Sequence, residues 1–418
     1  MKSATIVGQG YVGLPLARAA SEAGWHVWGL DQSASVVESL NQGLSHVDDV
    51  AASDLRAMLE QGYRATTNPV CVSESSVVIL CVPTPLGESG SPDLSAVRAA
   101  CEQVGPRLQA DDLVILESTT YPGTTEKVCR PILEQESGLS ALEDFHLAYS
   151  PERVDPGSKH HGIENTPKLV GGLSPAASSA ATSFYSEFVE EVVPLSGPRE
   201  AEMAKLLENT FRHINIALVN EMAKFCHELG IDIWEAIRGA STKPFGFMKF
   251  TPGPGVGGHC IPIDPNYLSY EVRHQLGYPF RFVELAQEIN SSMPSYVASR
   301  LTEILNQQGK AVNGASILLL GVTYKANVAD QREAPSVPLA EILARRGAVL
   351  SFHDPFVEQW QVGEATMPRV ASLSEAVPEA DVVVLLQEHS SYDLDWLVSH
   401  SEQFFDTRGV APEGAHRL

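Results

Sequence analysis

The feature that most constrains the fold is a glycine-rich turn between two short apolar runs near the N-terminus. The first run, Ala4–Val7, leads into the sequence GQGYVG at residues 8–13, and a helical pattern follows it. The second run, Val27–Leu30, ends at Asp31, which lies 18 residues after the last glycine. This order of strand, glycine turn, helix, strand and acid is typical of a dinucleotide-binding βαβ unit. The sequence therefore predicts an α/β fold that begins with a doubly wound, Rossmann-like domain.

The residues of the turn have separate expected roles in binding a dinucleotide. The glycines make the tight turn, admit the pyrophosphate and let the helix pack closely, while the helix N-terminus faces the phosphates. Asp31 is expected to accept hydrogen bonds from the ribose hydroxyls, and its charge favours NAD because it would repel the 2′-phosphate of NADP. A glycine turn in an unrelated sheet is the alternative. The predicted cofactor-binding residues of the turn are Gly8, Gly10, Tyr11, Val12 and Gly13.

Two further apolar runs, Val77–Val82 and Leu113–Glu117, are predicted strands that alternate with helical patterns. Each strand runs into a short loop, and these loops contain Thr84 and Thr119. Because the loops at the carboxyl ends of parallel strands line the cofactor crevice, both threonines are candidate contacts on the nicotinamide side. Either one could instead cap the N-terminus of a helix.

A fourth predicted strand, His146–Ser150, is followed by the polar segment PERVDP. Glu152 and Arg153 in this segment lie where a substrate bound beside the sheet would be reached. A solvated loop is an equally good interpretation of the spacing.

The longest helical pattern, Arg199–Gly230, has no Gly or Pro before its last residue. Lys205, Asn209 and Arg212 share one face of this helix, and apolar residues cover the others. We therefore expect the helix to connect two lobes and to contact a second copy of the chain. A bound anion or oxyanion would satisfy the three polar side chains, although a solvated stripe with ordinary ion pairs would also do so.

The segment 251–265, TPGPGVGGHCIPIDP, cannot form an ordinary helix or strand because of its glycines and prolines. It contains Cys260 and, four residues later, Asp264. This pattern predicts a positioned nucleophile beside an acid/base or water-orienting group. A buried structural cysteine next to a tight turn is the alternative. Two helices, near Phe280–Asn290 and near Pro294–Gln308, are expected to follow.

The last region, from Ala315, repeats the alternation of strands and helices. Gly321 and Asp354 stand where Gly8 and Asp31 stood in the first region, but the GxGxxG pattern is missing, so a second dinucleotide is not expected. An anion held by Lys325 and Arg332 would fit this plan, and ion pairs that cap helices are the alternative. The expected domains are an NAD-binding domain at residues 1–198, a helical domain at 199–310 and a second Rossmann-like domain at 311–418.

The composition limits the possible binding partners of the protein and its cellular compartment. The 29 Lys and Arg residues against 52 Asp and Glu residues leave a formal net charge of −23, which makes nucleic acid or an anionic membrane an unfavourable partner. We expect no signal sequence and no membrane-spanning run. The six cysteines show neither CxxC pairs nor a metal-ligand rhythm, so a cytoplasmic location without a bound metal is expected.

Seven segments together resemble the nucleotide-sugar 6-dehydrogenases, the family of UDP-glucose and GDP-mannose dehydrogenases. The similarity covers nearly the whole chain, and its branch is that of the UDP-N-acetylhexosamine enzymes, nearest to the UDP-N-acetylglucosamine 6-dehydrogenase type of polysaccharide synthesis. Asn266, where an aromatic residue is usual, and Ala334, in place of a serine, depart from the pattern. The seven segments are VGQGYVG, CVPTP, ESTTYPGTT, YSPERVDPG, KLLENTFRHINIALVNE, GPGVGGHCIPIDP and GVTYKANVADQREAPS.

The resemblance implies a four-electron oxidation of a sugar C6 alcohol by two NAD, through an aldehyde, a Cys260 thiohemiacetal and a thioester that water cleaves. It implies that Lys205 and Asn209 stabilise the oxyanion, that Asp264 orients water or acts as base, and that Glu152 assists hydrolysis. It also places Arg332 on the cofactor side, in its own or a neighbouring subunit. The substrate-binding residues that it implies are Glu152, Arg153, Val154, Lys205, Asn209, Arg212, Gly257 and Lys325, and Thr119 joins the catalytic group.

Other functions stay open at this point. UDP-N-acetylmannosamine or UDP-glucose is an alternative substrate. A two-electron dehydrogenase of the 3-hydroxyacid kind needs no nucleophilic cysteine and yields one NADH per substrate. A non-catalytic NAD- or nucleotide-sugar-binding regulator is the alternative from a different class, and it has no need of Cys260 together with Lys205, Asn209 and Asp264.

Overall fold

The computed structural model describes residues 2–47, 49–87, 91–154, 161–258 and 261–418. The chain divides into two compact units, one of residues 1–208 and 266–276, the other of residues 209–265 and 277–418. The division at residues 198 and 310 that the sequence suggests stays a prediction. Of the helices that the structure describes, not one is both long and apolar enough to cross a bilayer.

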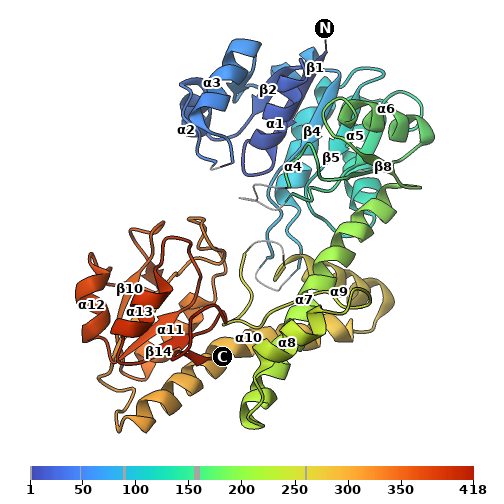
Figure 1. The fold of residues 1–418 in the computed structure, drawn as a ribbon. Helices are drawn as coiled ribbons and strands as arrows, with labels where there is room; N and C mark the ends of the chain where they lie inside the picture. Colours follow the sequence, from blue (N-terminus) through green and yellow to red (C-terminus); the bar gives the residue numbers. More distant parts are fainter. Residues whose placement is uncertain (1, 48, 88–90, 155–160, 259–260) are drawn as a thin grey trace. The chain divides into compact units, whose positions relative to one another are not determined.

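The first unit is built on an eight-stranded sheet in the order β3-β2-β1-β4-β5-β6-β7-β8 (Figure 1). Neighbouring strands are parallel except β6 and β7, which are antiparallel. The first six strands have the Rossmann order, in which ligands bind where the order reverses, here between β1 and β4. The strands are β1 Ser3–Val7, β2 His26–Leu30, β3 Arg64–Thr66, β4 Val77–Leu80, β5 Leu113–Leu116, β6 His146–Tyr149, β7 Lys168–Gly172 and β8 Val192–Pro194.

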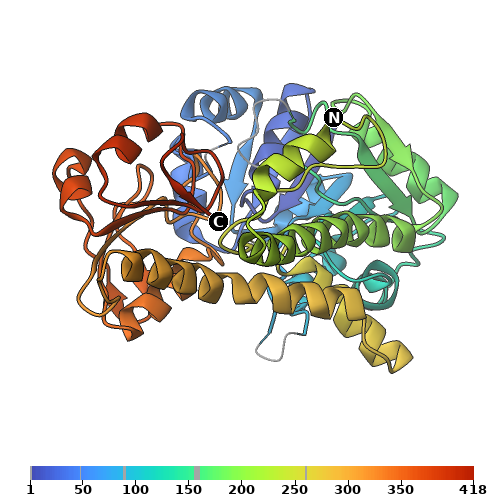
Figure 2. The ribbon, with the colours of Figure 1, turned by 60° about the horizontal axis from the view of Figure 1, so that its bottom comes forward.

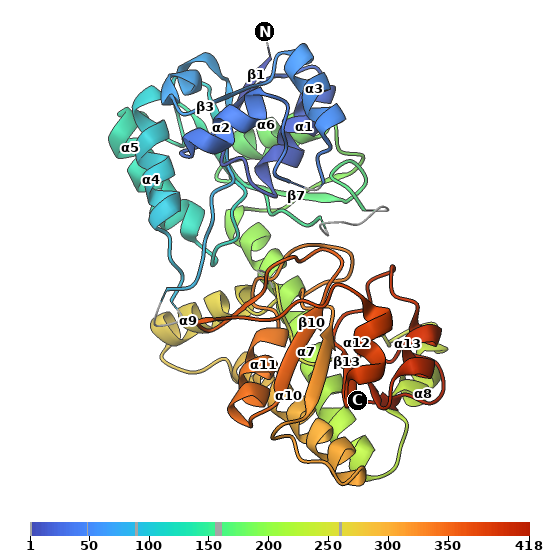
Figure 3. The same cartoon turned by 90° about the vertical axis from the view of Figure 1, so that its left-hand side faces the viewer.

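Helices cover both faces of this sheet because its central strands are apolar on both sides. In β4, Val77 and Ile79 belong to the core under α1, α3 and α6, while Val78 and Leu80 belong to the core under α4 and α5 (Figure 3). The helices are α1 Gly13–Glu22, α2 Ala34–Asn41, α3 Ala52–Gln61, α4 Ser95–Val104, α5 Arg130–Ser137 and α6 Pro175–Tyr185, with short helical turns at Pro69–Glu74, Gly105–Arg107 and Thr125–Cys129.

The second unit contains a five-stranded parallel sheet in the order β10-β9-β13-β14-β15. Its inner strands β9 and β13 alternate between two cores in the same way. Both units therefore confirm the predicted α/β class with Rossmann-like domains. The elements are β9 Ser316–Leu320, β10 Val349–His353, β11 Gln361–Val362, β12 Ala365–Thr366, β13 Val382–Leu385, β14 Phe404–Asp406 and β15 His416–Arg417, with α8 Ile233–Ser241, α11 Ser336–Arg345, α12 Leu373–Glu379 and α13 Leu394–His400.

The predicted long helix is α7, Pro198–Glu228, and it continues from the first unit into the second. Helix α9, Asp264–Leu276, also crosses the division, so Asp264 begins a helix where the sequence suggested only a loop. Local composition does not reveal this start, because a first-turn proline such as Pro265 suits a helix as well as a loop.

One helix, α10 Arg281–Gln307, replaces the two expected on either side of Pro294. It runs along the second half of α7 (Figure 2), where Lys224 donates to Ser292 at 2.6 Å and Asn220 to Asn290 at 2.9 Å. The prediction of two helices was wrong because a proline removes one helical hydrogen bond, and packing of the buried residues around it outweighs that loss.

Candidate functional site

The glycine turn joins β1 to α1 at the point where the strand order of the first sheet reverses. Gly8 has a φ of +90°, and a Cβ there would lie 2.4 Å from the carbonyl oxygen of Cys81. A Cβ on Gly13 would lie 1.9 Å from the carbonyl oxygen of Gly8, so the helix packs on the turn only because this side chain is absent. A Cβ on Gly10 would meet nothing within 4 Å. Gly10 therefore faces the open space that a bound pyrophosphate needs.

Asp31 follows β2 at the same edge of the sheet. Its two carboxylate oxygens accept from the backbone N–H groups of Gln9 and Ser33, both at 2.9 Å. Each oxygen keeps acceptor capacity for a ribose hydroxyl. Tyr11 is exposed and Val12 lies at the start of α1, as a dinucleotide turn requires. These residues fit NAD.

The loops that carry Thr84 and Thr119 meet at the carboxyl ends of β4 and β5. Ser118 Oγ donates to the carbonyl oxygen of Val82 at 2.7 Å, and the Tyr267 hydroxyl donates to the carbonyl oxygen of Thr84. The loop of Thr119 therefore lies beside the loop of Thr84, near the glycine turn, and contact of either threonine with the nicotinamide stays a prediction.

Glu202, a residue of α7 that was not among the predicted site residues, connects this loop to the helix. Its carboxylate accepts from the N–H of Gly123 at 2.5 Å, and from the N–H and hydroxyl of Thr125 at 2.9 and 2.7 Å. The side chain is fully buried, and burial raises the pKa of Glu202 to about 7. A buried acid one helical turn before Lys205 thus holds the threonine loop against the helix.

The first unit brings Glu152 and Lys205 together. Lys205 Nζ donates to the carbonyl oxygen of Glu152, and the Glu152 carboxylate accepts from the N–H of Val154 at 2.6 Å. On its other side, the Glu152 carboxylate lies 3.5 Å from Lys168 Nζ. Burial alone raises the pKa of Glu152, but Lys168, the Val154 N–H and Lys205 outweigh burial and hold that pKa below its ordinary value. Glu152 is therefore held in its ionised form.

Arg153 contacts other residues of the first unit. Its guanidinium pairs with Glu208 of α7 at 2.7 Å and donates to the carbonyl oxygen of Pro167. In this arrangement Arg153 secures its segment to α7, and its predicted role in holding substrate stays a prediction.

The second unit brings Asn209 and Asp264 together. Asn209 Nδ2 donates to Asp264 Oδ2 at 2.5 Å, and both side chains are buried. Arg212, one turn further along α7, is exposed. The amide and the carboxylate, 55 positions apart in sequence, thus form one hydrogen-bonded pair at the N-terminus of α9.

The loop before Asp264 packs against the loop that follows β9. The N–H of Gly258 donates to the carbonyl oxygen of Arg332 at 3.0 Å, and a Cβ on Gly257 would lie 2.7 Å from the carbonyl oxygen of Glu333. Gly257 is therefore required by close packing. Cys260, the predicted nucleophile, lies outside the described residues.

Lys325 and Arg332 come from the loop between β9 and α11. Arg332 pairs with Asp330 in the same loop at 2.5 Å and is exposed, and its predicted role in binding an anion or the cofactor stays a prediction. The Lys325 loop is fixed by buried His389, which accepts from the N–H of Asn327 at 2.9 Å. The other ring nitrogen of His389 lies 3.0 Å from Asp354, so the ring connects the Lys325 loop to Asp354.

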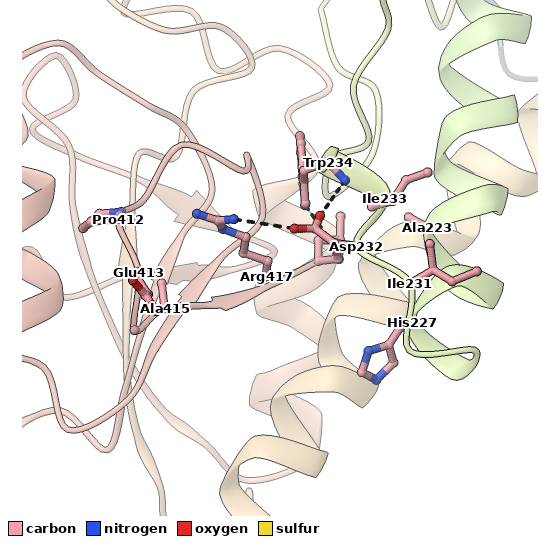
Figure 4. Close-up of a pocket in the computed structure, with 12 residues that line it drawn as sticks. Ala223, His227, Ile231, Asp232, Ile233, Trp234, Pro412, Glu413, Ala415 and Arg417 are labelled. Carbon is pink, nitrogen blue, oxygen red and sulfur yellow. Dashed lines mark hydrogen bonds and ion pairs between the residues drawn. The ribbon is translucent and has the colours of Figure 1, made fainter. Parts of the chain in front are cut away.

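A hollow of about 310 Å³ in the second unit contains none of the predicted site residues (Figure 4). It lies between the start of α8 and the C-terminal segment, where Arg417 approaches Asp232 at 4.0 Å. Among the described residues, no three His, Cys, Asp or Glu side chains are grouped to hold a metal ion.

Three buried charged residues near the site, Lys168, Glu117 and Glu202, are not predictable as site residues from the sequence. The available signals were weak: a lysine that opens the apolar strand KLVGG, and a glutamate that ends the apolar run LVILE. A charge at a buried strand end indicates a paired group, but the sequence does not identify its partner.

Three models of the UDP-glucose/GDP-mannose dehydrogenase family match the chain. They are the NAD binding domain at residues 2–189, the central domain at 199–292 and the UDP binding domain at 318–413. The UDP-N-acetyl-D-glucosamine 6-dehydrogenase of Pseudomonas aeruginosa is 36% identical over 400 residues, covering 95% of this chain and 90% of that protein.

Two other proteins are similar over nearly their whole length. The UDP-N-acetyl-D-mannosamine dehydrogenase of Escherichia coli K12 is 34% identical, covering 97% of this chain and 98% of that protein. The solved structure of a UDP-D-ManNAc dehydrogenase from Pyrococcus horikoshii has a TM-score of 0.90 and 33% identity, covering 100% of this chain and 99% of that one.

Proposed function

Because the chain belongs to the UDP-glucose/GDP-mannose dehydrogenase family and is an NAD-dependent UDP-sugar dehydrogenase, we propose that it oxidises the C6 hydroxymethyl group of a UDP-N-acetylhexosamine to the uronic acid. UDP-N-acetylglucosamine is the proposed substrate, for the synthesis of a surface polysaccharide. When bound, NAD would supply the hydride acceptor for each of the two oxidations, and the roles of the chain's own residues follow below.

The observation that carries this proposal is the arrangement of two polar pairs on consecutive turns of α7. Lys205 contacts the Glu152 segment, and Asn209 contacts Asp264. An amine and an amide are suitable donors for an oxyanion, and the two carboxylates are suitable groups to orient water and accept its proton. A regulator that only binds nucleotides has no use for these four groups.

The proposed chemistry assigns a role to each of these groups. Cys260 adds to the C6 aldehyde, and after the second oxidation its sulfur is part of a thioester. Lys205 and Asn209 stabilise the oxyanion and Lys205 also moves protons, Asp264 orients the water, and Glu152 takes a proton from it. Thr119 lies on the nicotinamide side. Lys325, Gly257, Arg153, Val154 and Arg212 are proposed to hold the UDP-sugar, and Arg332 to reach the cofactor.

The experiment supplies a panel of UDP-sugars with NAD and counts NADH per uronate formed. The proposal expects two NADH per uronate and the highest kcat/KM with UDP-N-acetylglucosamine. UDP-N-acetylmannosamine is the second candidate, because similar proteins at 34% identity carry that activity in their names. One NADH per product would instead support a two-electron dehydrogenase.

Cys260→Ser tests the covalent step. The variant is expected to lose uronate formation while it still binds the UDP-sugar, and Cys226→Ser, at another cysteine of the same unit, is the matched control. Uronate formation that survives Cys260→Ser would refute the proposed mechanism.

We also propose that α7 forms the contact of a homodimer or a larger oligomer. Five large apolar side chains of this helix are exposed at helical spacing. A single exposed apolar side chain needs no explanation, but a row of them along one helix indicates an interaction surface. Leu207→Glu is expected to shift the sedimentation profile to the monomer, whereas Leu44→Glu, at an exposed leucine elsewhere, is not. The five are Met203, Leu207, Phe211, Leu218 and Phe225.

A further inference from the structure

A row of polar side chains leads from the core of the first unit to Glu152. Tyr185 and Glu117 have fully buried side chains, and the side chain of Lys168 is 5% exposed. Glu152, at the end of the row, has a side chain that is 17% exposed. The four residues come from α6, the end of β5, β7 and the loop after β6, so the sheet itself assembles the row.

Lys168 is the centre of this row. Its ammonium nitrogen lies 3.0 Å from Glu117 Oε1 and 3.5 Å from Glu152 Oε2. The Tyr185 hydroxyl donates to the same Glu117 oxygen, and the ammonium lies 5.1 Å from the centre of the Tyr185 ring. One ammonium is thus held between an inner and an outer carboxylate.

Burying such a row has a large free-energy cost if its only role is to stabilise the fold. Removing a carboxylate or an ammonium from water costs several kcal/mol, and apolar side chains of similar volume are often at least as stabilising. Glu117 Oε2 also finds no hydrogen-bond partner among the residues that the structure describes. The row therefore calls for an explanation beyond packing.

The two carboxyl groups that share Lys168 are not equivalent. Burial raises the pKa of Glu117, whereas Lys168 and the Val154 N–H hold the pKa of Glu152 below its ordinary value despite burial. The other titratable groups around the row are Lys205 and the Cys81 thiol, whose pKa burial raises. The outer carboxyl is thus the one that the row keeps ionised.

The outer end of the row borders a small hollow of about 10 Å³, which Glu152, Lys168 and Thr166 help to line. This is about the space that one water molecule requires in a polar site. Water can therefore approach the carboxylate that Lys168 holds.

We propose that Lys168, anchored by Glu117 and Tyr185, is a positioning residue that holds the Glu152 carboxylate in place for the water-consuming step. This inference rests on the proposed function. In that step the water oxygen bonds to the thioester carbon and one water proton passes to Glu152. The carbon–sulfur bond then breaks, the Cys260 sulfur leaves as thiolate, and the uronic acid is released. No electrons are transferred, so the step needs no further reactant.

The test compares Lys168→Met, Lys168→Arg and the full-length wild type in rapid mixing with UDP-N-acetylglucosamine and NAD. Lys168→Met is expected to keep the burst of NADH from the two oxidations while kcat falls about tenfold or more, since base catalysis contributes about 10²–10⁴-fold. The thioester-linked enzyme is then expected to accumulate and to be seen by mass spectrometry after acid quench. Lys168→Arg should restore most of kcat because it keeps the charge.

The pH profile of kcat would not change if Lys168 had only a structural role, so it tests the positioning role directly. The acid limb of kcat is expected to shift to higher pH in Lys168→Met, because Glu152 loses its cation. Glu117→Gln, which keeps Lys168 but removes the competing carboxylate, is expected not to move that limb upward. This second variant keeps the inference testable if Lys168→Met does not fold.

The matched control is Lys310→Met in the second unit, where a lysine also bridges two carboxylates, Asp381 at 2.6 Å and Glu402 at 2.9 Å. It should leave the burst, kcat and the acid limb unchanged. An unchanged kcat and pH profile in Lys168→Met would overturn the inference. So would an equal slowing of every step that Lys168→Arg does not rescue, or an upward shift of the acid limb in Glu117→Gln.

Failure of the proposed function looks different from failure of this inference. If the wild type gives one NADH per product and no thioester, the proposed function is wrong whatever the variants do. If the wild type gives two NADH per uronate and a thioester while the Lys168 variants hydrolyse it at the wild-type rate, only the positioning role is wrong.

Discussion

An alanine substitution is expected to have different effects at two glycines of the dinucleotide turn, Gly10 and Gly13. Gly13→Ala should lower stability, and Gly10→Ala should weaken NAD binding without lowering stability. The reason is geometric: a methyl group at Gly13 would lie 1.9 Å from the carbonyl oxygen of Gly8 and 3.2 Å from Ile6 Cγ2, whereas at Gly10 it would meet nothing within 4 Å.

The magnitudes follow from these distances. The methyl group at Gly13 meets backbone, which cannot turn away as a flexible side chain would, so the turn and α1 must move apart. Overpacking of this kind costs about 1–3 kcal/mol, and a unit of this size loses about 2–4 °C of Tm per kcal/mol. At Gly10 the change in stability should stay within about 0.5 kcal/mol. There the methyl group occupies space that the pyrophosphate needs, and we expect at least a tenfold weaker affinity, about 1.4 kcal/mol.

The assay combines calorimetric melting without ligand and titration calorimetry with NAD. Gly239→Ala is the matched control, because this glycine lies in α8 of the second unit and its added methyl group would also meet nothing within 4 Å. The control should not lower the Tm, because alanine is a better helix former than glycine, and it should leave the Kd for NAD unchanged. A Gly10→Ala protein that binds NAD as the wild type does, or that melts as early as Gly13→Ala, would refute the reasoning.

Three further predictions concern buried polar groups. Asn209→Ala removes the hydrogen bond to Asp264 and a proposed oxyanion donor. In steady-state assays kcat should therefore fall about 10²-fold or more. A variant with the wild-type kcat would contradict the proposed role of Asn209. Burial raises the pKa of Glu202 from 4.5 to about 7, so stability that is fully present below pH 4.5 is lost as the pH rises through 7. Urea unfolding of the wild type at pH 5 and pH 8 should show this loss in the free energy of unfolding, which is roughly 3 kcal/mol at most. The Glu202→Gln variant should not show such a loss. Burial lowers the pKa of His213 from 6.5 to about 4, so stability present above pH 6.5 should fall by roughly 3 kcal/mol as the pH drops to 4; a His213→Gln protein with the same acid sensitivity would contradict this assignment.

The sequence by itself determined the parts of this protein that depend on local patterns. The turn at residues 8–13 needs glycine at fixed positions, and Asp31 follows at the end of the next strand, so both were predictable from spacing. The loops of Thr84 and Thr119 were predictable as well, because each follows an apolar run and parallel strands present their carboxyl ends at one edge. The helix that continues through Pro294 was not, since packing there outweighs a local signal.

Only the tertiary structure decided which polar groups are partners. Asn209 meets Asp264 across 55 positions, and Lys168 lies between Glu117 and Glu152, which are 35 positions apart in the sequence. These pairings depend on the order of strands in a sheet and on the start of α9, which no short window of sequence contains. A charged residue at the end of an apolar run shows that a partner must exist, because burial of an unpaired charge is too costly. The partner itself is fixed by which strands lie side by side once the chain has folded.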